Sequence, residues 1–95
     1  MTALAATVRD NEAAHRYELL VGEELAGELI YRARDRVVTL IHTEVAPEYE
    51  GHGLGEQLVS YALDDLRARE LRIVPLCPFV GAYLRRHPEY EDLVE

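Results

Sequence analysis

Three glycines alternate with other residues in the segment Glu50–Gly55, between an apolar, strand-like run and an amphipathic helical pattern. Glycine lets backbone N–H groups point into a concave turn, and the start of a helix adds roughly half a positive charge. Such a turn typically holds an anion, most often pyrophosphate. The segment therefore predicts a phosphate-binding loop, and the alternative is a glycine-rich turn that only reverses the chain.

Other glycine-rich phosphate loops fit this segment less well. The dinucleotide-binding fingerprint requires glycine at its first, third and sixth positions, and the sixth position here is Glu56. A P-loop is excluded because no Gly-Lys-Ser or Gly-Lys-Thr sequence follows. What remains is Gly-x-Gly-x-Gly leading directly into the helical sequence Glu56-Gln57-Leu58-Val59.

Hydrophobic periodicity predicts four strands, a helix, a strand and a second helix. After the glycines, apolar residues recur every four positions with charged residues between them, which is typical of a helix packed on a sheet. The run Val37–Val45 is β-branched and nearly continuous, so we expect a central strand covered on both faces. The first strand starts at Val8, the other strands span Arg16–Val21, Glu28–Arg32, Val37–Val45 and Leu71–Leu76, and the helices run from Leu54 to about Glu70 and from about Phe79 to Arg86.

Length and charge restrict the class of protein. The 95 residues are expected to form one domain, residues 1–95. Ten Lys plus Arg residues stand against 18 Asp plus Glu residues, and the resulting net charge of −8 argues against nucleic acid as a partner. No apolar run is long enough to span a membrane, and the residues Met1–Ala6 lack the basic region of a signal peptide.

The single cysteine, Cys77, excludes an internal disulfide and is compatible with a reducing compartment. We therefore expect a cytoplasmic protein. No group of His, Cys and Asp residues has the spacing of a metal site, so no metal is expected. The sequence does not indicate an oligomeric state.

Four motifs in a fixed order carry a resemblance to a known family. They are His42–Pro47, the glycine loop, Val74–Phe79 and Tyr83–Tyr90. Together they resemble the small, truncated members of the GNAT N-acetyltransferase superfamily, and the match extends from about Tyr17 to Tyr90. The resemblance implies an α+β fold with a twisted, mixed but mostly antiparallel sheet of about five strands and two helices, in the order ββββαβα.

The resemblance also implies a function. The protein is expected to be an acyltransferase that moves the acetyl group of acetyl-CoA to a primary amine, whose identity stays open. Two alternatives remain: a domain that binds CoA or acyl-CoA as a sensor or adaptor without catalysis, and an interaction module that binds no nucleotide. The chain departs from the superfamily in two ways, because Glu50 stands where Arg or Gln is usual and because the two helices between the first two strands are absent.

The family pattern assigns cofactor contacts residue by residue. A backbone N–H near Val45 is expected to polarise the thioester carbonyl, and Phe79 and Arg86 are expected to contact the cofactor near the second helix. A Cβ at any of the three glycines is expected to block close approach of the pyrophosphate. The loop contacts implied by the resemblance are Glu50, Gly51, His52, Gly53, Leu54, Gly55 and Glu56.

Cys77 and His42 are the candidates for chemistry. Cys77 stands at a strand end just before a predicted helix, where the helix dipole favours a thiolate, and it either forms an acetyl-cysteine or only lines the pocket. His42 is the candidate general base, because histidine is the residue type suited to proton transfer near neutral pH, and Glu44, on the same face as Leu40, is expected to assist it, unless His42 is a buried core histidine. Tyr83 falls where the superfamily often places the tyrosine that protonates the departing CoA thiolate, although a packing role is the alternative.

Overall fold

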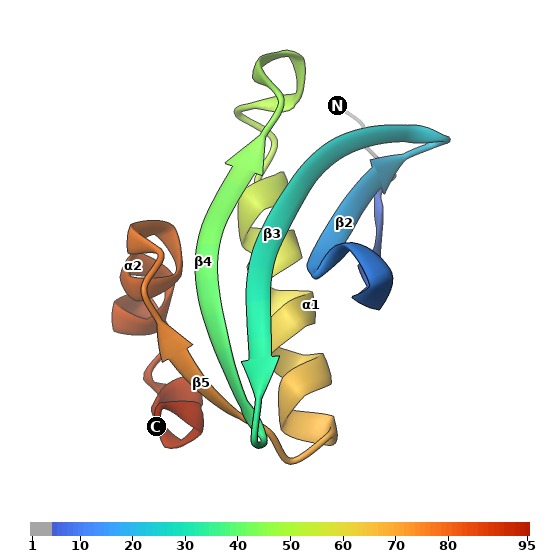
Figure 1. Cartoon of the computed structure of the whole chain (residues 1–95). Helices are drawn as coiled ribbons and strands as arrows, with labels where there is room; N and C mark the ends of the chain where they lie inside the picture. Colours follow the sequence, from blue (N-terminus) through green and yellow to red (C-terminus); the bar gives the residue numbers. More distant parts are fainter. Residues whose placement is uncertain (1–4) are drawn as a thin grey trace.

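The computed structural model describes residues 5–95 and has the predicted order ββββαβα (Figure 1). Three short 3₁₀ segments that the sequence did not predict join these elements: η1 (Glu12–Ala14), η2 (Pro47–Tyr49) and η3 (Pro88–Leu93). The strands are β1 (Thr7–Asn11), β2 (Arg16–Val21), β3 (Glu24–Arg34), β4 (Val37–Val45) and β5 (Arg72–Pro75), and the helices are α1 (Leu54–Ala68) and α2 (Pro78–Arg86).

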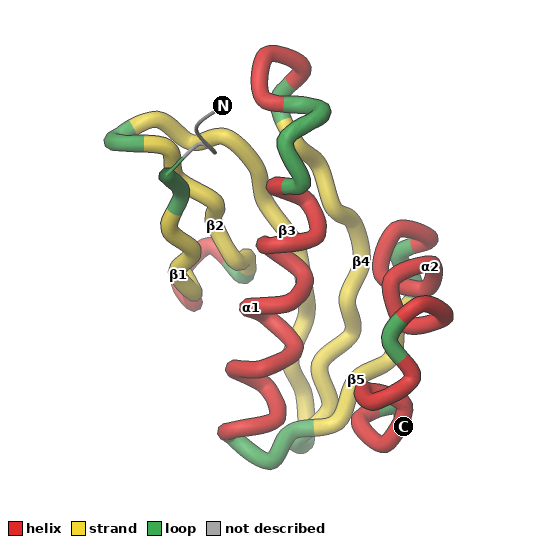
Figure 2. Tube along the Cα trace, turned by 180° about the vertical axis from the view of Figure 1, so that it is seen from behind, coloured by secondary structure: helices red, strands yellow, loops and turns green. Residues whose placement is uncertain are grey.

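The five strands form one sheet in the order β1-β2-β3-β4-β5. The first four strands are antiparallel to their neighbours, and β5 is parallel to β4. A parallel pair requires a crossover connection, and α1 provides it along one face of the sheet (Figure 2). The predicted mixed, mostly antiparallel sheet is therefore confirmed.

β3 and β5 differ in extent from the sequence prediction, and β3 also continues to Arg34, beyond its predicted end at Arg32. β3 begins at Glu24, not at Glu28, because only Gly22 and Glu23 form the turn, with Gly22 at φ +62°. β5 is shorter than predicted and ends at Pro75, which has no N–H to continue the ladder.

The core lies between the sheet and α1. The buried side of α1 presents the apolar residues that recur every three or four positions, as the periodicity predicted. They pack against Tyr17, Leu19, Leu29 and Leu40, which are fully buried on the facing side of the sheet. Burial of each large aliphatic side chain contributes about 1.5–3 kcal/mol, so this layer is the main source of stability. The buried residues of α1 are Leu54, Gly55, Leu58, Val59, Ala62, Leu63 and Leu66.

Within residues 5–95, no helix covers the second face of the sheet, so the expectation that β4 is covered on both faces is wrong. Val38 and Leu40 are buried toward α1, but Val37, Thr39 and Ile41 are only half-buried. The two views in Figures 1 and 2 show α1 on one side of the sheet only. We call the side opposite α1 the open face, to which Glu18, Ile30 and Thr39 belong.

A β-bulge in β4 reverses the alternation of its side chains. Ile30 pairs with His42 while the next residue, Tyr31, pairs with Leu40, so Ile41 is an extra residue. Leu40 therefore faces α1, whereas His42 points to the open face beside its partner Ile30. The expectation that His42 shares a face with Leu40 is wrong, because strict alternation does not hold across a bulge.

Among the described residues, no helix is both long enough and apolar enough to cross a membrane.

Candidate functional site

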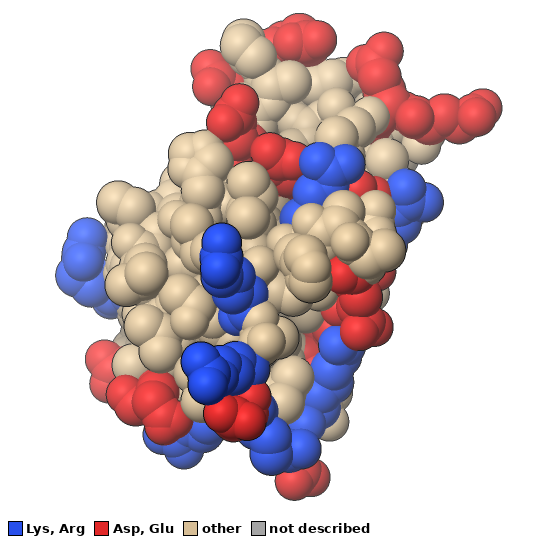
Figure 3. Space-filling view, in the orientation of Figure 1, with Lys and Arg blue, Asp and Glu red and all other residues tan. Residues whose placement is uncertain are grey.

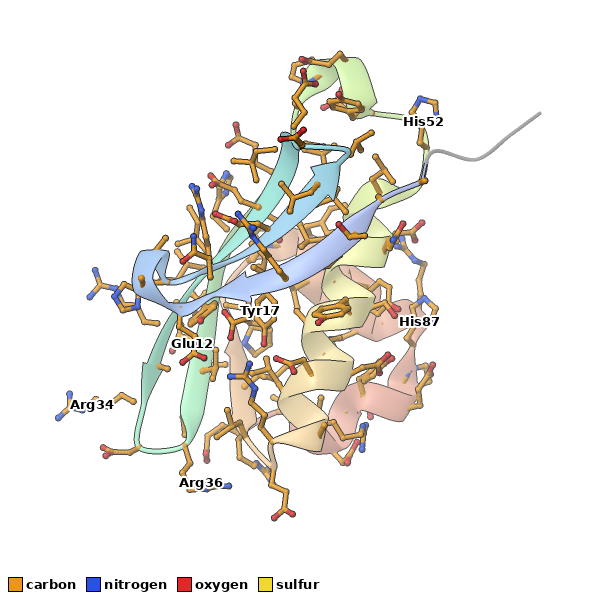
Figure 4. The ribbon with its side chains drawn as sticks, turned by 90° about the vertical axis from the view of Figure 1, so that its right-hand side faces the viewer. Glu12, Tyr17, Arg34, Arg36, His52 and His87 are labelled. Atoms are coloured by element: carbon orange, nitrogen blue, oxygen red, sulfur yellow. The ribbon has the colours of Figure 1, made fainter. Side chains whose placement is uncertain are left out.

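A cleft of about 550 Å³ lies where the end of β4, the glycine loop, the start of α1 and α2 meet. All residues predicted to contact a cofactor line it except His52. Figure 4 shows His52 at the outer end of the loop, where its side chain points away from the body of the protein. Thr43, Glu44 and Tyr49 line the cleft as well. The predicted residues in the lining are Val45, Glu50, Gly51, Gly53, Leu54, Gly55, Glu56, Phe79 and Arg86.

The glycine loop ends in a left-handed residue that starts α1. Gly51 and Gly53 have φ values of +85° and +73°, and Gly53 is the N-cap of the helix. The first helical hydrogen bond is donated by the Gln57 N–H to the Gly53 carbonyl. The N–H groups of Leu54, Gly55 and Glu56 therefore have no carbonyl partner in the helix, and no side chain caps them. They form the donor set that an anion at a helix N-terminus requires.

The three glycines are required for different reasons. A Cβ on Gly51 or Gly53 would meet no protein atom within 4 Å, so within the protein it is the positive φ that requires glycine there, and the block against the pyrophosphate stays a prediction. A Cβ on Gly55 would lie 2.8 Å from Cζ of Phe79. Gly55 thus allows the ring of Phe79, at the start of α2, to pack against the first turn of α1 beside the cleft.

Carboxylates outnumber cations around the cleft. Glu44, Glu50 and Glu56 line it, and Arg86 is the single guanidinium among the lining residues. Arg86 donates to Glu56 at 2.7 Å and thereby ties α2 to the first turn of α1. Acidic side chains also gather at this end of the molecule, around the loop after β4 (Figure 3). An anion in this cleft must therefore rely on backbone N–H groups.

Tyr49 lines the cleft and forms a hydrogen bond with an acidic side chain. Its hydroxyl donates to the carboxylate of Glu24, and this hydrogen bond raises the pKa of Tyr49 above its ordinary value. The contact connects the η2 segment after β4 with the start of β3.

β4 and β5 separate beside the cleft. Their pairing ends at Leu40 and Pro75, and the Leu40 carbonyl accepts hydrogen bonds from the N–H groups of Leu76 and Cys77, both at 3.0 Å. Among the described residues, the segment from Ile41 to Val45 has no strand on its β5 side. Backbone groups on this edge of β4 are therefore free to pair with an extended ligand. Figure 1 shows the two strands diverging toward the glycine loop.

Cys77 lies at the point where the two strands separate. It is the N-cap residue of α2 and is only 2% exposed. Its Sγ is 3.3 Å from Oγ1 of Thr43, a residue that lines the cleft. The thiol of Cys77 therefore does not line the cleft itself, and the side chain of Thr43 lies between the two.

The structure does not bring His42 and Cys77 together. The His42 side chain is 53% exposed, and its Nε2 is 3.0 Å from Oε1 of Glu44. Adjacent residues of a strand point to opposite faces, so His42 is on the open face while Thr43 faces Cys77. The sequence did not indicate Thr43, because its direction depends on the bulge at Ile41.

Tyr83 packs inside the protein. It is buried, and its ring stacks on His87 with centroids 4.1 Å apart and an interplanar angle of 23°. The Tyr90 ring lies 6.1 Å from it on the other side of the same cluster. These contacts agree with the packing alternative, and the role of Tyr83 as a proton donor stays a prediction.

Among the described residues, no group of three or more His, Cys, Asp or Glu side chains could hold a metal ion.

Comparison with known proteins identifies the family. Residues 16–93 match the family described as GCN5-related N-acetyl-transferase, and the chain therefore belongs to this family. The predicted resemblance to GNAT proteins is confirmed.

Among curated proteins, the chain is similar to Protein NATD1 of chicken and mouse, with 34% identity over 53 residues, or 56% of this chain and 48% of each relative. The human Protein NATD1 is equally similar. The chain thus spans about half the length of the curated relatives it matches.

Two solved structures share the fold. The solution structure of a GCN5-like putative N-acetyltransferase from Staphylococcus aureus has a TM-score of 0.68 and 23% identity, and the match covers 100% of this chain and 91% of that one. The crystal structure of the ribosomal-protein-S18-alanine N-acetyltransferase from Escherichia coli has a TM-score of 0.59 and 24% identity over 63% of this chain and 39% of that one.

Proposed function

We propose that the protein binds acetyl-CoA in the cleft and transfers the acetyl group to a primary amine. The observation that carries the proposal is the cleft itself, in which the free N–H groups of the α1 N-terminus lie beside the unpaired edge of β4. One part suits a pyrophosphate and the other suits an extended amide-containing arm. Family membership supports the same donor.

Different residues around the cleft would bind different parts of acetyl-CoA. The N–H groups of Leu54, Gly55 and Glu56 would hold the pyrophosphate oxygens, and Arg86 would be attracted to the same charge from α2. The backbone from Ile41 to Val45 would pair with the pantetheine amides, and a free N–H near Val45 would polarise the thioester carbonyl. Loss of one such oxyanion donor typically costs about 2.7–4 kcal/mol in the barrier.

The proposal includes a covalent route through Cys77. Sγ of Cys77 attacks the thioester carbonyl carbon, the bond from that carbon to the CoA sulfur breaks, and the thiol proton passes to the departing CoA sulfur. Thr43, which contacts Sγ and lines the cleft, would position the thiol. The amine nitrogen then attacks the carbonyl carbon of the acetyl-cysteine, and the bond from that carbon to Sγ breaks. The amide forms, the amine gives one proton to a base, and Sγ takes up one proton from solvent to restore the thiol.

In this proposal, His42 is the general base that acts on the acceptor amine. His42 and Glu44 lie on the open face beside the end of β4, so an amine that reached the thioester from that face would meet this pair. Neutral imidazole would accept the proton that the amine loses, and Glu44 would orient the ring through the 3.0 Å contact.

A second candidate function is binding of CoA or acyl-CoA without catalysis. The observation that favours it is the burial of Cys77, because a thiol that is 2% exposed needs a movement of Thr43 before it meets a thioester. In that case the same cleft would bind the ligand, and no acetyl group would move.

Incubation with labelled acetyl-CoA tests the proposal. We expect label on Cys77 by mass spectrometry and its transfer to members of a panel of primary amines. Cys77→Ala should lose the label and still bind CoA in calorimetry, and His42→Gln should keep the label but slow its transfer. CoA at one hundred times its Kd should stabilise the fold by about 2.7 kcal/mol.

The possible outcomes separate the functions. CoA binding with neither label nor acetylated amine supports the binding-only domain. Acetylated amine with unchanged activity in Cys77→Ala shows direct transfer and removes the covalent route. Absence of any thermal shift with CoA overturns both proposals.

A further inference from the structure

On one half of the open face, charged side chains pair with one another. Glu18 is buried there, with 2% exposure, and accepts hydrogen bonds from Arg9 at 2.8 Å, Arg16 at 2.7 Å and Asn11 at 3.0 Å. Arg16 also pairs with Glu28 at 2.8 Å. The donors and acceptors of this network satisfy one another, so this half offers little to a partner.

The other half of the open face is apolar. A broad depression of about 1080 Å³ extends over β3 and β4. We call it the open-face groove. Ile30, Val37, Thr39 and Ile41 form its floor, and its charged lining residues are Arg32, Arg34 and Asp35, with His15 beside them. It shares no lining residue with the cleft at the glycine loop. The floor residues are half-buried, since no helix covers them.

The arginines of the groove lack effective counter-charges. Arg32 has no ion-pair partner among the described residues. Arg34 contacts only Asp35 at 3.6 Å, with the two side chains 92% and 88% exposed, and such a pair contributes little. In Figure 4, Arg34 extends away from the protein at the β3–β4 turn. Figure 3, which views the open face, shows basic side chains on a largely uncharged middle part of this face, with acidic side chains at its lower end and above it.

We propose that the open-face groove docks an amphipathic segment of a partner protein whose aliphatic side chains are flanked by carboxylates. The aliphatic side chains would cover the floor, and the carboxylates would pair with Arg32 and Arg34. The net charge of −8 opposes an acidic partner only at long range, because charges are screened beyond about 8 Å at physiological salt. A two-fold pairing of this groove with itself is disfavoured, since it would bring the arginines of both copies together.

Titration monitored by NMR tests the proposal. The probe is a synthetic amphipathic helix with leucines on one side and glutamates on the other, and the control peptide has lysines in place of the glutamates. We expect the amide signals of Ile30, Arg32, Thr39 and Ile41 to shift with the acidic peptide only. Arg32→Glu should weaken this binding by about tenfold or more, while the matched change Arg85→Glu on α2 should leave it unchanged.

Other outcomes overturn the proposal. Shifts of equal size with both peptides, or shifts confined to the cleft, would show that the arginines do not select the partner. Binding to anionic phospholipid vesicles that depends on Arg32, without binding of the acidic peptide, would assign the groove to a membrane surface. Dimerisation that Arg32→Glu abolishes would assign it to a second copy. Circular dichroism of each variant verifies folding, and Ile41→Thr gives a second, uncharged test of the floor.

Discussion

At the scale of single residues, the glycines of the loop show how one residue type serves different needs. Gly51 and Gly53 supply positive φ values in open space, whereas Gly55 supplies room for Phe79. The sequence pattern gave all three one expected role, close approach of the pyrophosphate, and the structure adds a separate requirement within the protein for each. Their substitutions are therefore expected to fail in different ways.

Gly53→Ala should lower the free energy of unfolding by about 1 kcal/mol, because an alanine in the left-handed conformation is strained. Gly53→Asn is the matched control, since asparagine tolerates this conformation better and should cost less. Urea unfolding measures both variants. Equal losses for Ala and Asn would contradict a conformational cause, and would indicate that added volume matters at this position.

At the scale of elements, the start of β3 and the end of β4 approach each other unusually closely. Gly27 of β3 pairs with Val45 of β4, and a Cβ on Gly27 would lie 2.8 Å from the backbone oxygen of Glu44. A backbone atom in a ladder cannot move aside as a side chain can. The absence of a side chain at Gly27 thus allows β3 to approach β4 closely where β4 borders the cleft.

Gly27→Ala should therefore destabilise the fold by about 1–3 kcal/mol through overpacking, and should also weaken CoA binding if the cleft holds CoA. Gly81→Ala is the control, because its Cβ would meet only Nη1 of Arg85 at 3.9 Å inside α2. That change should stabilise the protein by up to about 1 kcal/mol through helix propensity. Thermal unfolding distinguishes the two, and a Gly27→Ala variant as stable as the parent would refute the close contact.

At the scale of the whole molecule, the buried ion network of Glu18 connects three strands. Its hydrogen bonds reach β1 through Arg9 and Asn11, and Arg16 connects it to Glu28 of β3. The bond from Asn11, followed by those from Arg9 and Arg16, lowers the pKa of Glu18 to about 2 against the opposing effect of burial. Because the pKa of Glu18 is lowered in the folded protein, the free energy of unfolding is expected to decrease at acidic pH.

The contribution of Glu18 should be complete above its ordinary pKa of 4.5 and disappear as the pH falls toward about 2. Between these values the unfolded chain takes up the proton first, so stability falls with falling pH. Glu18→Gln should cost about 2 kcal/mol near neutral pH, and the difference from the parent should shrink toward zero in acid. Urea unfolding across the acid range measures it, with exposed Glu23→Gln as control. A difference independent of pH would contradict the role of the charge.

The prediction from sequence succeeded where the signal was local or carried by the family. The helix after the glycines and the order ββββαβα follow from periodicity, and nine of the twelve residues that line the cleft were implied by the family resemblance. It failed at β4, where a bulge at Ile41 turns His42 to the open face and Thr43 toward Cys77. No composition or spacing rule marks one extra residue inside a β-branched run, because the bulge depends on the pairing partner.

The sequence by itself determined the elements, the glycine loop and the family, because periodicity, turn chemistry and backbone freedom are properties of neighbouring residues. Only the tertiary structure decided which face of β4 each side chain occupies, that β4 and β5 separate beyond Leu40, and that half of the sheet's second face is left apolar with Arg32 and Arg34 among its charged lining residues. These features depend on register and packing between segments far apart in the chain, where one inserted residue redirects every side chain that follows it.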